Sequence, residues 1–373
     1  MTFHALGEKE RVAAFLGKLS ENAGVAEATV LDLLDSPTPE SLAAVCAVAR
    51  RLRQRHFGNR VFLYGFLYIS THCRNHCRFC SYRGDNPGAV RYRKTLDQVV
   101  DSARHLARAG VHLIDLTAGE DPRFYHGGAD PFGQVVQTVN AVREATGLPV
   151  MASVGVVEDK NLERLVAAGA DWYACYQETH NRRLFEQLRT GQDYDLRFDS
   201  KRDAKARGLL VEEGLLCGVG ETPYDLLASL AAMTRLGADQ VRVMTFVPQA
   251  GTPLENHPVP PPLREMAVIA LMRIAFPQLL IPASLDVDGL AGLRQRLDAG
   301  ANVVTSLVPP GRGLAGVAQG SKDIEDGRRT VAGIAATLQD CRLAPATAAQ
   351  YRTWVDQRKR DTAVDAGRVP AAC

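Results

Sequence analysis

The 373-residue sequence lacks long apolar runs, and none approaches the roughly 18 consecutive apolar residues needed to cross a bilayer. Its first ten residues also lack the positive segment and apolar core of a secretion signal. Charge of one sign is missing as well, because 44 basic and 42 acidic residues are spread without blocks and give a net charge of +2. This balance offers no track for nucleic acid and no face for an anionic membrane. We therefore expect a cytoplasmic protein with no nucleic-acid or membrane partner.

The spacing of the cysteines does not form a disulfide framework. Small secreted proteins space their cysteines densely, whereas five of the eight here lie singly along a long chain: Cys46, Cys175, Cys217, Cys341 and Cys373. Free thiols of this kind favour a reducing compartment. We expect Cys373 to belong to a frayed terminus rather than to a ligand set.

The other three cysteines are close together, after an apolar run that predicts a strand. Cys73, Cys77 and Cys80 have the spacing C-x3-C-x2-C, and thiolates in one tight loop select iron–sulfur clusters, zinc or copper(I). A cubane cluster usually takes four cysteines, so three leave one iron open to a ligand that binds and reacts. A zinc site with a distant fourth ligand is the alternative. Structural zinc sites normally pair two short motifs, and the sequence has no second pair.

Short apolar runs alternate with helical patterns through most of the chain. The expected strands are 62–70, 111–117, 149–154, 172–176, 209–217, 240–247, 279–285 and 302–308. The expected helices between and after them are 95–109, 132–145, 160–168, 199–206, 223–236, 263–276, 290–299 and 322–338. Glycines at 110, 169, 237 and 300 stand where a helix should end and turn into the next strand. The pattern predicts an α/β fold, a (βα)8 TIM-type barrel, with an open doubly wound sheet as the alternative.

The barrel accounts for residues 61–343 in this interpretation. Residues 1–60 read as an N-terminal helical cap packed on the barrel, or alternatively as a separate binding module, although 60 residues rarely hold an independent core. Residues 344–373 predict a C-terminal tail with one helix at 350–359 and a mobile end at 361–373.

Four polar residues lie within or at the ends of apolar strands and form a candidate lumen set: Asp115, Arg242, Ser284 and Asp286. Chemistry in such barrels gathers at the C-terminal ends of the strands. A buried charge needs a partner, so we expect a ligand carboxylate to pair with Arg242 and a cation or hydrogen-bond donors in the barrel lumen to pair with Asp115. One cation, two anions and a hydroxyl suit a small amino acid with one carboxylate and two ammonium groups. An internal salt-bridge network that stabilises the barrel is the alternative.

The cysteine loop resembles the signature of the radical S-adenosylmethionine superfamily, and Phe79 matches the aromatic residue common there. The resemblance implies a [4Fe–4S] cluster held by the three cysteines, with S-adenosylmethionine on the free iron. It also assigns cofactor-binding residues: Phe79, Gly119, Glu120, Ser153, Glu178, Arg197, Gly218 and Gly220. Glu120 would receive the methionine ammonium, Glu178 and Arg197 would hold the charged head of the cosubstrate, and the two glycines would approach the adenine. The spacing of Glu178, Arg189 and Arg197 is similar to that in the branch of biotin synthase and the [FeFe]-hydrogenase maturase.

Residues 63–317 are similar in several segments, in the same order, to the methylornithine synthase family of pyrrolysine biosynthesis. These include Tyr-Ile-Ser-Thr-x-Cys-Arg-Asn-x-Cys-Arg-Phe-Cys, Tyr-Gln-Glu-Thr and Ile-Pro-Ala-Ser-Leu-Asp. The lumen set falls at the family's substrate positions. The resemblance implies an isomerase that removes hydrogen from L-lysine, cleaves Cα–Cβ and rejoins the fragments as (3R)-3-methyl-D-ornithine. A one-electron donor such as flavodoxin or ferredoxin would be its partner.

Two other radical enzymes are weighed against this interpretation. Biotin synthase holds a second cluster with a cysteine where this chain has Val211, Glu212 and Glu213, which disfavours sulfur insertion. A radical enzyme of the same branch acting on a different amino acid remains the alternative. The insertion at 126–131 and the Ala-rich tail depart from the family without touching its motifs.

Overall fold

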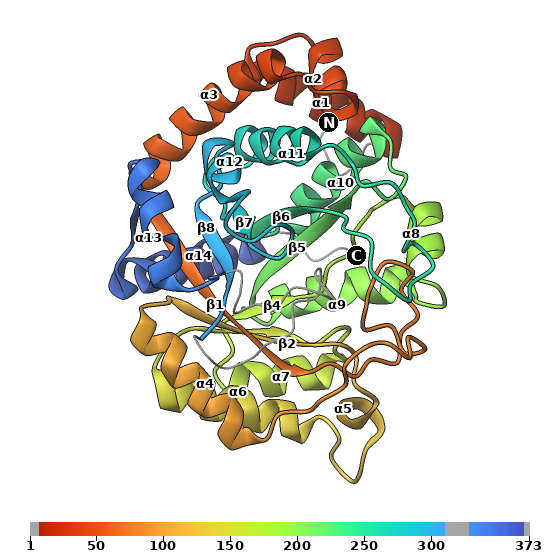
Figure 1. Cartoon of the computed structure of the whole chain (residues 1–373), viewed down its shortest axis with the longest axis vertical. Coiled ribbons are helices and arrows are strands. Elements are labelled where there is room, and N and C mark those ends of the chain that lie inside the picture. Colours follow the sequence, from red (N-terminus) through yellow and green to blue (C-terminus); the bar gives the residue numbers. More distant parts are fainter. Residues whose placement is uncertain (1–6, 310–327, 369–373) are drawn as a thin grey trace.

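The computed structural model describes residues 7–309 and 328–368, with side chains described as far as residue 362. Eight parallel strands surround a central axis, with helices on the outside (Figure 1). The strands are β1 Arg60–Ser70, β2 Leu113–Ala118, β3 Val150–Ser153, β4 Trp172–Ala174, β5 Leu210–Cys217, β6 Gln240–Thr245, β7 Pro282–Ser284 and β8 Val303–Leu307. A short β9, Ala344–Pro345, pairs with β1.

The strand order identifies the sheet as a barrel. Neighbours run β6-β5-β4-β3-β2-β1-β8-β7, so each of β1 to β5 pairs with the next strand along the chain, β7 pairs with β8, and β1 pairs with β8. An isolated bridge between Gln240 and Leu280 joins the two ends, with the amide of Val241 3.0 Å from the carbonyl oxygen of Leu280. The barrel is therefore nearly closed. The predicted (βα)8 fold is confirmed and the open doubly wound sheet is excluded.

Helices cover the outside of the barrel, as the alternating pattern predicted. They are α4 Leu96–Ala109, α5 Pro122–His126, α6 Gly133–Thr146, α7 Asp159–Ala167, α8 Arg182–Leu188, α9 Tyr194–Ala206, α10 Pro223–Leu236, α11 Pro262–Ala275, α12 Leu293–Asp298 and α13 Val331–Asp340. The strands are buried on both faces, which explains why β1 is apolar almost throughout. The glycine that ends α4, Gly110, has φ +95°, and this left-handed backbone turns the chain into β2.

Some elements differ from the prediction. The short helices α5 and α8 and strand β9 were not predicted, because each has too few residues to show a period. Helix α13 begins at Val331 rather than at 322, and residues 322–327 lie outside the described part. Strand β7 is shorter than its apolar run, since only Pro282–Ser284 pairs with β8.

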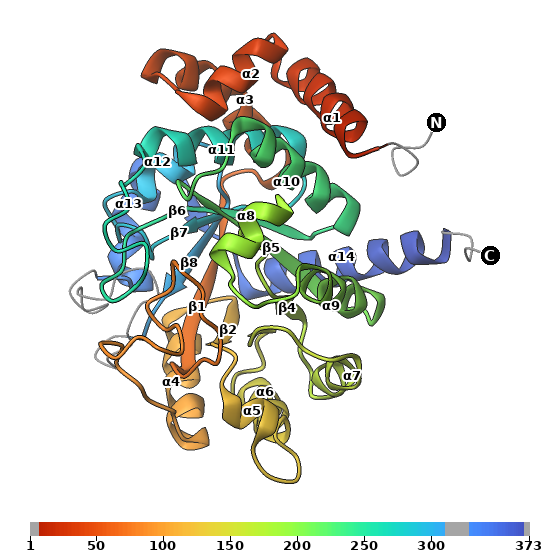
Figure 2. The same cartoon turned by 90° about the vertical axis from the view of Figure 1, so that its right-hand side faces the viewer.

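The first three helices pack on one outer side of the barrel (Figure 2). These helices, α1 Glu8–Ala23, α2 Glu27–Asp35 and α3 Pro39–Phe57, contact α10 and α11. Their apolar side chains join the main hydrophobic core, to which Val30 and Leu33 contribute with no exposed surface. The buried guanidinium of Arg53 donates hydrogen bonds to the carbonyl oxygens of Leu297 and Ala301, at the end of α12.

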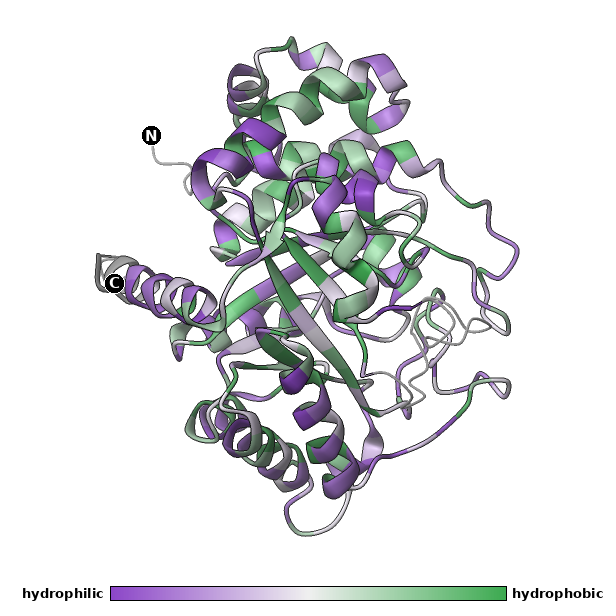
Figure 3. Ribbon diagram, turned by 60° about the vertical axis from the view of Figure 1, so that its left-hand side comes forward, coloured by the Kyte–Doolittle hydropathy of each residue, from purple (hydrophilic) through white to green (hydrophobic). Residues whose placement is uncertain are grey.

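The last element that the structure describes is helix α14, Ala348–Arg368, which lies across the N-terminal end of the barrel and projects beyond it (Figure 2). The fully buried Tyr351 donates a hydrogen bond from its hydroxyl to that of Tyr64, at 2.8 Å. The rings of Trp172 and Trp354 stack with centroids 6.0 Å apart. The projecting part is largely hydrophilic (Figure 3).

The helix that the sequence predicts at 350–359 is longer in the structure, because residues 361–368 continue α14; a mobile end at 361–373 stays a prediction. Polar contacts hold the helix where apolar periodicity fades. Arg358 Nε donates to Asp239 Oδ1 at 2.7 Å, and Lys205 Nζ donates to Thr362 Oγ1 at 3.3 Å. Residues 369–373, including Cys373, lie outside the described part.

Candidate active site

The cysteine loop leaves β1 and folds over the C-terminal end of the barrel. It is fixed by backbone hydrogen bonds, from Arg74 N to Glu120 O at 3.0 Å, from Arg78 N to Leu188 O at 2.8 Å and from Gly84 N to Asn75 O at 2.7 Å. All three cysteines line one cavity of about 220 Å³ that extends down into the barrel. In the described residues, no three His, Cys, Asp or Glu side chains surround a single point as the ligands of one ion would. In a [4Fe–4S] cluster, by contrast, each cysteine binds a different iron, so the three sulfur atoms need not surround one point.

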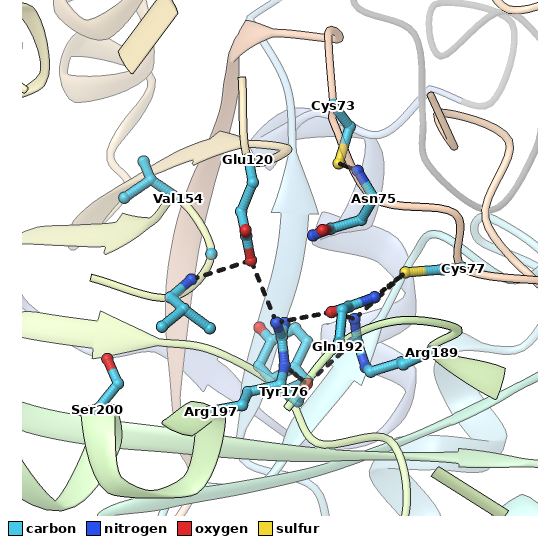
Figure 4. A network of polar contacts seen from close by, with 12 residues as sticks. Cys73, Asn75, Cys77, Glu120, Val154, Tyr176, Arg189, Gln192, Arg197 and Ser200 are labelled. Atoms are coloured by element: carbon cyan, nitrogen blue, oxygen red, sulfur yellow. Dashed lines mark hydrogen bonds and ion pairs between the residues drawn. The ribbon is translucent and has the colours of Figure 1, made fainter. Parts of the chain in front are cut away.

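Hydrogen-bond donors point at the sulfur atoms. Gln192 Nε2 donates to Cys77 Sγ at 3.0 Å, and Arg189 Nη1 donates to the same sulfur at 3.5 Å (Figure 4). The backbone N–H of Asn75 donates to Cys73 Sγ at 3.5 Å. Such donors stabilise negative sulfur, and hydrogen bonds to sulfur tune iron–sulfur clusters. The residues present therefore fit a thiolate-bound cluster.

Gly119 gives the loop the room it needs. A Cβ on Gly119 would lie 2.6 Å from Cys73 Cβ and 2.8 Å from the carbonyl oxygen of His72. Only a glycine allows β2 to approach the cysteine loop this closely.

Burial raises the pKa of the Cys80 thiol to about 12, and the neighbouring Cys77 and Cys73 add to the effect. Because metal ligation requires a thiolate, cluster binding must displace the proton of the Cys80 thiol. The ring of Phe79 lies in the same loop and packs against an apolar cluster that includes Leu188 and Phe246. The Arg189 guanidinium lies 5.3 Å from the centre of that ring.

Beside the cysteines, a buried charged network consists of Glu120, Glu178, Arg189 and Arg197, and Figure 4 shows Glu120 and the two arginines. Arg197 Nη1 lies 3.4 Å from Glu120 Oε1, and Arg74 Nη2 lies 3.0 Å from Glu120 Oε2. Burial alone would raise the pKa of Glu120, but Arg197, the hydrogen bond from the amide of Val156 and then Arg74 hold it below its usual value. Arg189 Nη2 donates to Glu178 Oε1 at 2.8 Å. Arg189 and Arg197 each also donate a hydrogen bond to the carbonyl oxygen of Tyr176, which fixes their positions.

Glu178 has an unusual backbone. Its φ is +68°, in the left-handed region that costs a non-glycine residue energy, so the surrounding structure must hold it there. Glu213 supplies part of that support, because its Oε1 accepts from the amides of Gln177 and Gly214, each at 2.8 Å. The buried Lys201 in turn pairs with Glu213. Burial raises the pKa of Glu178 despite the nearby Arg189 and Arg197.

Most of the residues predicted to bind the cofactors line the same cavity as the three cysteines. The cavity is lined by Phe79, Gly119, Glu120, Ser153, Glu178 and Arg197. Gly218 and Gly220 do not line it. They shape the turn between β5 and α10, where Glu221 accepts hydrogen bonds from the amides of Gly218 and Val219. A Cβ on Gly218 would lie 2.2 Å from the ring of Pro260.

Deeper in the barrel, the predicted lumen set is partly assembled. Asp115, Arg242 and Asp286 line the cavity, whereas Ser284 lies behind Asp286 with its Oγ 3.4 Å from Asp286 Oδ2. Burial raises the pKa of Asp115 to about 7, and the negative Glu212 adds to the rise.

Arg242 has a partner within the protein, and the ligand carboxylate expected for it stays a prediction. Its Nε donates to Glu212 Oε1 at 2.7 Å. Asp286 is paired as well, since it accepts from Arg329 Nη1 at 2.8 Å and from Ser306 Oγ at 2.6 Å. Among the residues that the structure describes, the lumen thus holds three acids and two arginines rather than two acids and one arginine. Glu212 and Gly214 are two residues apart on β5, so their side chains lie on the same face of the strand. This spacing can be seen in the sequence and would have placed Glu212 with the lumen residues.

A (βα)8 barrel with three cysteines in one loop at the C-terminal ends of its strands is typical of a radical S-adenosylmethionine enzyme. The sequence of the chain agrees, because residues 67–232 match the family model of the Radical SAM superfamily. The chain belongs to the 3-methylornithine synthase family within this class. It is 40% identical to 3-methylornithine synthase of Methanosarcina acetivorans over 344 residues, which cover 92% of this chain and 97% of that protein.

A crystal structure of methylornithine synthase superposes with a TM-score of 0.82 at 41% identity, covering 87% of this chain and 95% of that chain. Biotin synthase of Heliobacterium modesticaldum is 34% identical over 236 residues, 62% of this chain and 70% of that protein. Membership in the superfamily implies a [4Fe–4S] cluster and S-adenosylmethionine. Within the described residues, no helix is both long enough and apolar enough to span a membrane.

Proposed function

We propose that this protein isomerises L-lysine to (3R)-3-methyl-D-ornithine, the first step of pyrrolysine biosynthesis. The observation that carries the proposal is the charged lumen below the cysteine loop, found in a chain that is 40% identical to 3-methylornithine synthase. The reaction would remove a hydrogen atom from the lysine side chain, break the Cα–Cβ bond, rejoin the glycyl and alkene fragments at a new position and return a hydrogen atom to the rejoined radical.

The cofactors would occupy the upper part of the cavity. Cys73, Cys77 and Cys80 would hold the cluster, and the Glu120, Glu178 and Arg197 group would bind the charged head of S-adenosylmethionine. Together these cofactors supply a 5′-deoxyadenosyl radical, which abstracts hydrogen. Arg189 Nε is buried without a hydrogen-bond partner among the described residues, which leaves a donor for a ligand acceptor.

The lower cavity suits lysine by charge. With the acids ionised, the described residues of the lumen set Asp115, Glu212 and Asp286 against Arg242 and Arg329, so this set carries one net negative charge. Lysine carries two ammonium groups and one carboxylate and would neutralise it. Arg242 would bind the carboxylate, and Asp115 and Asp286 would bind the ammonium groups, with Ser284 supporting Asp286.

Apolar walls would confine the fragments. Phe66, Tyr68, Tyr176 and Met244 line the same cavity as the charged residues. Such walls exclude water and hold the two fragments near each other until they recombine.

The test separates substrate binding from cofactor chemistry. Arg242→Ala should abolish lysine turnover, while slow cleavage of S-adenosylmethionine without lysine persists, because Arg242 lies away from the cysteine loop. Arg104→Ala, on the exposed face of α4, is the matched control and should keep full turnover. Normal lysine turnover by Arg242→Ala would contradict the proposed substrate site.

We also infer that the one-electron donor, such as flavodoxin or ferredoxin, docks on the cysteine loop. Residues 72–94 contain one acidic residue, Asp85, and six basic ones: Arg74, Arg78, Arg83, Arg91, Arg93 and Lys94. The side chains of Arg74, His76 and Arg78 are exposed between the cysteines. This face would attract a carrier with an acidic surface.

The thiols of Cys46, Cys175 and Cys217 are free, which supports a reducing, cytoplasmic setting.

Arg78→Glu should slow cluster reduction by such a carrier and weaken its salt dependence. Reduction by dithionite should stay unchanged, because a small reductant needs no docking. Arg55→Glu, exposed on α3, is the control and should behave as the unaltered protein. Equal carrier-driven rates for Arg78→Glu and Arg55→Glu would contradict this docking face.

A further inference from the structure

Glu212 is a fully buried carboxylate at the centre of the barrel, and it does not line the cavity. Its Oε1 accepts from Arg242 Nε at 2.7 Å, and its Oε2 accepts from the hydroxyl of Tyr176 at 2.8 Å. Both partners do line the cavity. Any influence of Glu212 on a substrate therefore passes through these two side chains and through its charge.

The contacts of Glu212 orient Arg242. The carboxylate binds the Nε side of the guanidinium, and the Tyr176 ring lies 5.4 Å from the guanidinium carbon. Arg242 has no other hydrogen bond to the residues that the structure describes. Its terminal nitrogens are thus held available to the cavity, in the fork that matches a carboxylate.

The backbone is shaped to keep Tyr176 in this position. A Cβ on Gly214 would lie 2.8 Å from the Tyr176 ring, so only glycine allows the ring to pack across β5. Gly214 also pairs with Arg242 in the sheet register. Glu212, Gly214, Tyr176 and Arg242 therefore form one rigid unit.

Glu212 also decides the charge of the lumen. Among the described residues and with Asp115 ionised, Asp115 and Asp286 would balance Arg242 and Arg329 without Glu212, whereas with Glu212 this set has one excess negative charge. A net charge in a buried site is costly unless a ligand neutralises it. A ligand of net charge +1 is favoured, and a neutral amino acid of the same length is disfavoured.

We infer that Glu212 is a positioning and specificity residue: it presents Arg242 to the substrate carboxylate and makes the lumen select an amino acid of net positive charge. The inference rests on the proposed function, because it takes lysine as the substrate. It adds that the ε-ammonium is selected by a charge that never touches it.

The experiment measures binding of L-lysine and of L-norleucine, which lacks the ε-ammonium, by anaerobic calorimetry on the enzyme loaded with cluster and S-adenosylmethionine. The unaltered enzyme should prefer lysine. Glu212→Gln keeps the shape and removes the charge, and it should lower the lysine-to-norleucine affinity ratio by about tenfold or more. Tyr176→Phe keeps the charge and should leave the ratio within about threefold.

Iron content and thermal unfolding show whether each variant is folded. If Glu212→Gln does not fold, Glu212→Asp serves instead: it keeps the charge but draws Arg242 back, so both ligands should weaken while the ratio stays. A folded Glu212→Gln with the original ratio, or a Glu212→Asp with unchanged affinities, would overturn the role of Glu212. Failure of the unaltered enzyme to bind lysine would overturn the proposed function together with this inference.

Discussion

At the scale of single residues, sequence spacing located the side chains whose partners are local. Cys73, Cys77 and Cys80 were predicted as one site because a loop of eight residues brings them together whatever surrounds it. Glu212 and Gln192 were missed because their significance depends on partners from other elements, Arg242 in one case and Cys77 in the other. A single sequence shows which residues are polar but not which of them meet across a barrel. The catalytic and binding roles of the predicted site residues stay predictions.

Asp115 should make lysine binding dependent on pH. Its pKa of about 7 in the ligand-free site reflects burial and the charge of Glu212, opposed by Arg242. An ammonium group binds the ionised carboxylate, so binding must remove a proton when the pH is below 7. Lysine affinity should therefore rise with pH and level off above 7, with a limiting slope of about tenfold per pH unit on the acid side.

Calorimetry between pH 5.5 and 7.5 checks this, and Asp115→Asn removes the titrating group. That variant should bind lysine weakly and with a much flatter pH profile. A profile in Asp115→Asn that matches the unaltered enzyme would assign the titration to another group.

At the scale of elements, the strands and long helices were predicted because each has a clear period and a glycine or a cap at its end. Strand β4 and helix α8 show where this fails. The apolar run at 172–176 predicts one strand, but β4 ends at Ala174. The next two residues, Cys175 and Tyr176, are apolar as well, but they line the cavity instead of continuing the strand. Helix α8 is short and its arginines are exposed, so only Leu184, Phe185 and Leu188 mark a buried face.

The contact between β2 and the cysteine loop gives a prediction for an element junction. Gly119→Ala should lower the iron content of the reconstituted protein, because the new Cβ would lie 2.6 Å from Cys73 Cβ. Gly88→Ala is the matched control in the same loop, since its Cβ would meet only Asn86 Oδ1 at 3.5 Å. Iron analysis and the visible absorption spectrum make the comparison. Full iron content in Gly119→Ala would show that the loop can shift to accept the extra carbon.

At the scale of the whole molecule, the barrel was predictable because eight units repeat the same alternation. How its ends are closed was not. The N-terminal end is covered by α14, which follows more than 20 residues after the last barrel strand and buries Tyr351 and Val355 under the sheet. Polar contacts to Asp239 and Asp171 complete its attachment, and such contacts leave no periodic signal. The division into a cap at 1–60, a barrel at 61–343 and a tail at 344–373 stays a prediction.

Removing the ring at the floor of the barrel should destabilise the protein. Tyr351→Ala would leave a cavity beside Phe62 and Tyr64 and strip Tyr64 of its hydroxyl partner. Values for buried aromatic residues suggest a loss of about 3–5 kcal/mol in the free energy of unfolding. Arg360→Ala, exposed on the same helix, should change it by less than about 0.5 kcal/mol. Urea denaturation measures both, and equal stabilities would mean that α14 is not part of the cooperative fold.

The central claim is that the charged cavity under the cysteine loop rearranges lysine. Its most direct test is anaerobic incubation of the reconstituted protein with dithionite, S-adenosylmethionine and isotopically labelled L-lysine, followed by chromatography and mass spectrometry. The account predicts a labelled product with the mass of lysine that co-elutes with (3R)-3-methyl-D-ornithine. Cleavage of S-adenosylmethionine with every lysine molecule recovered unchanged would contradict it.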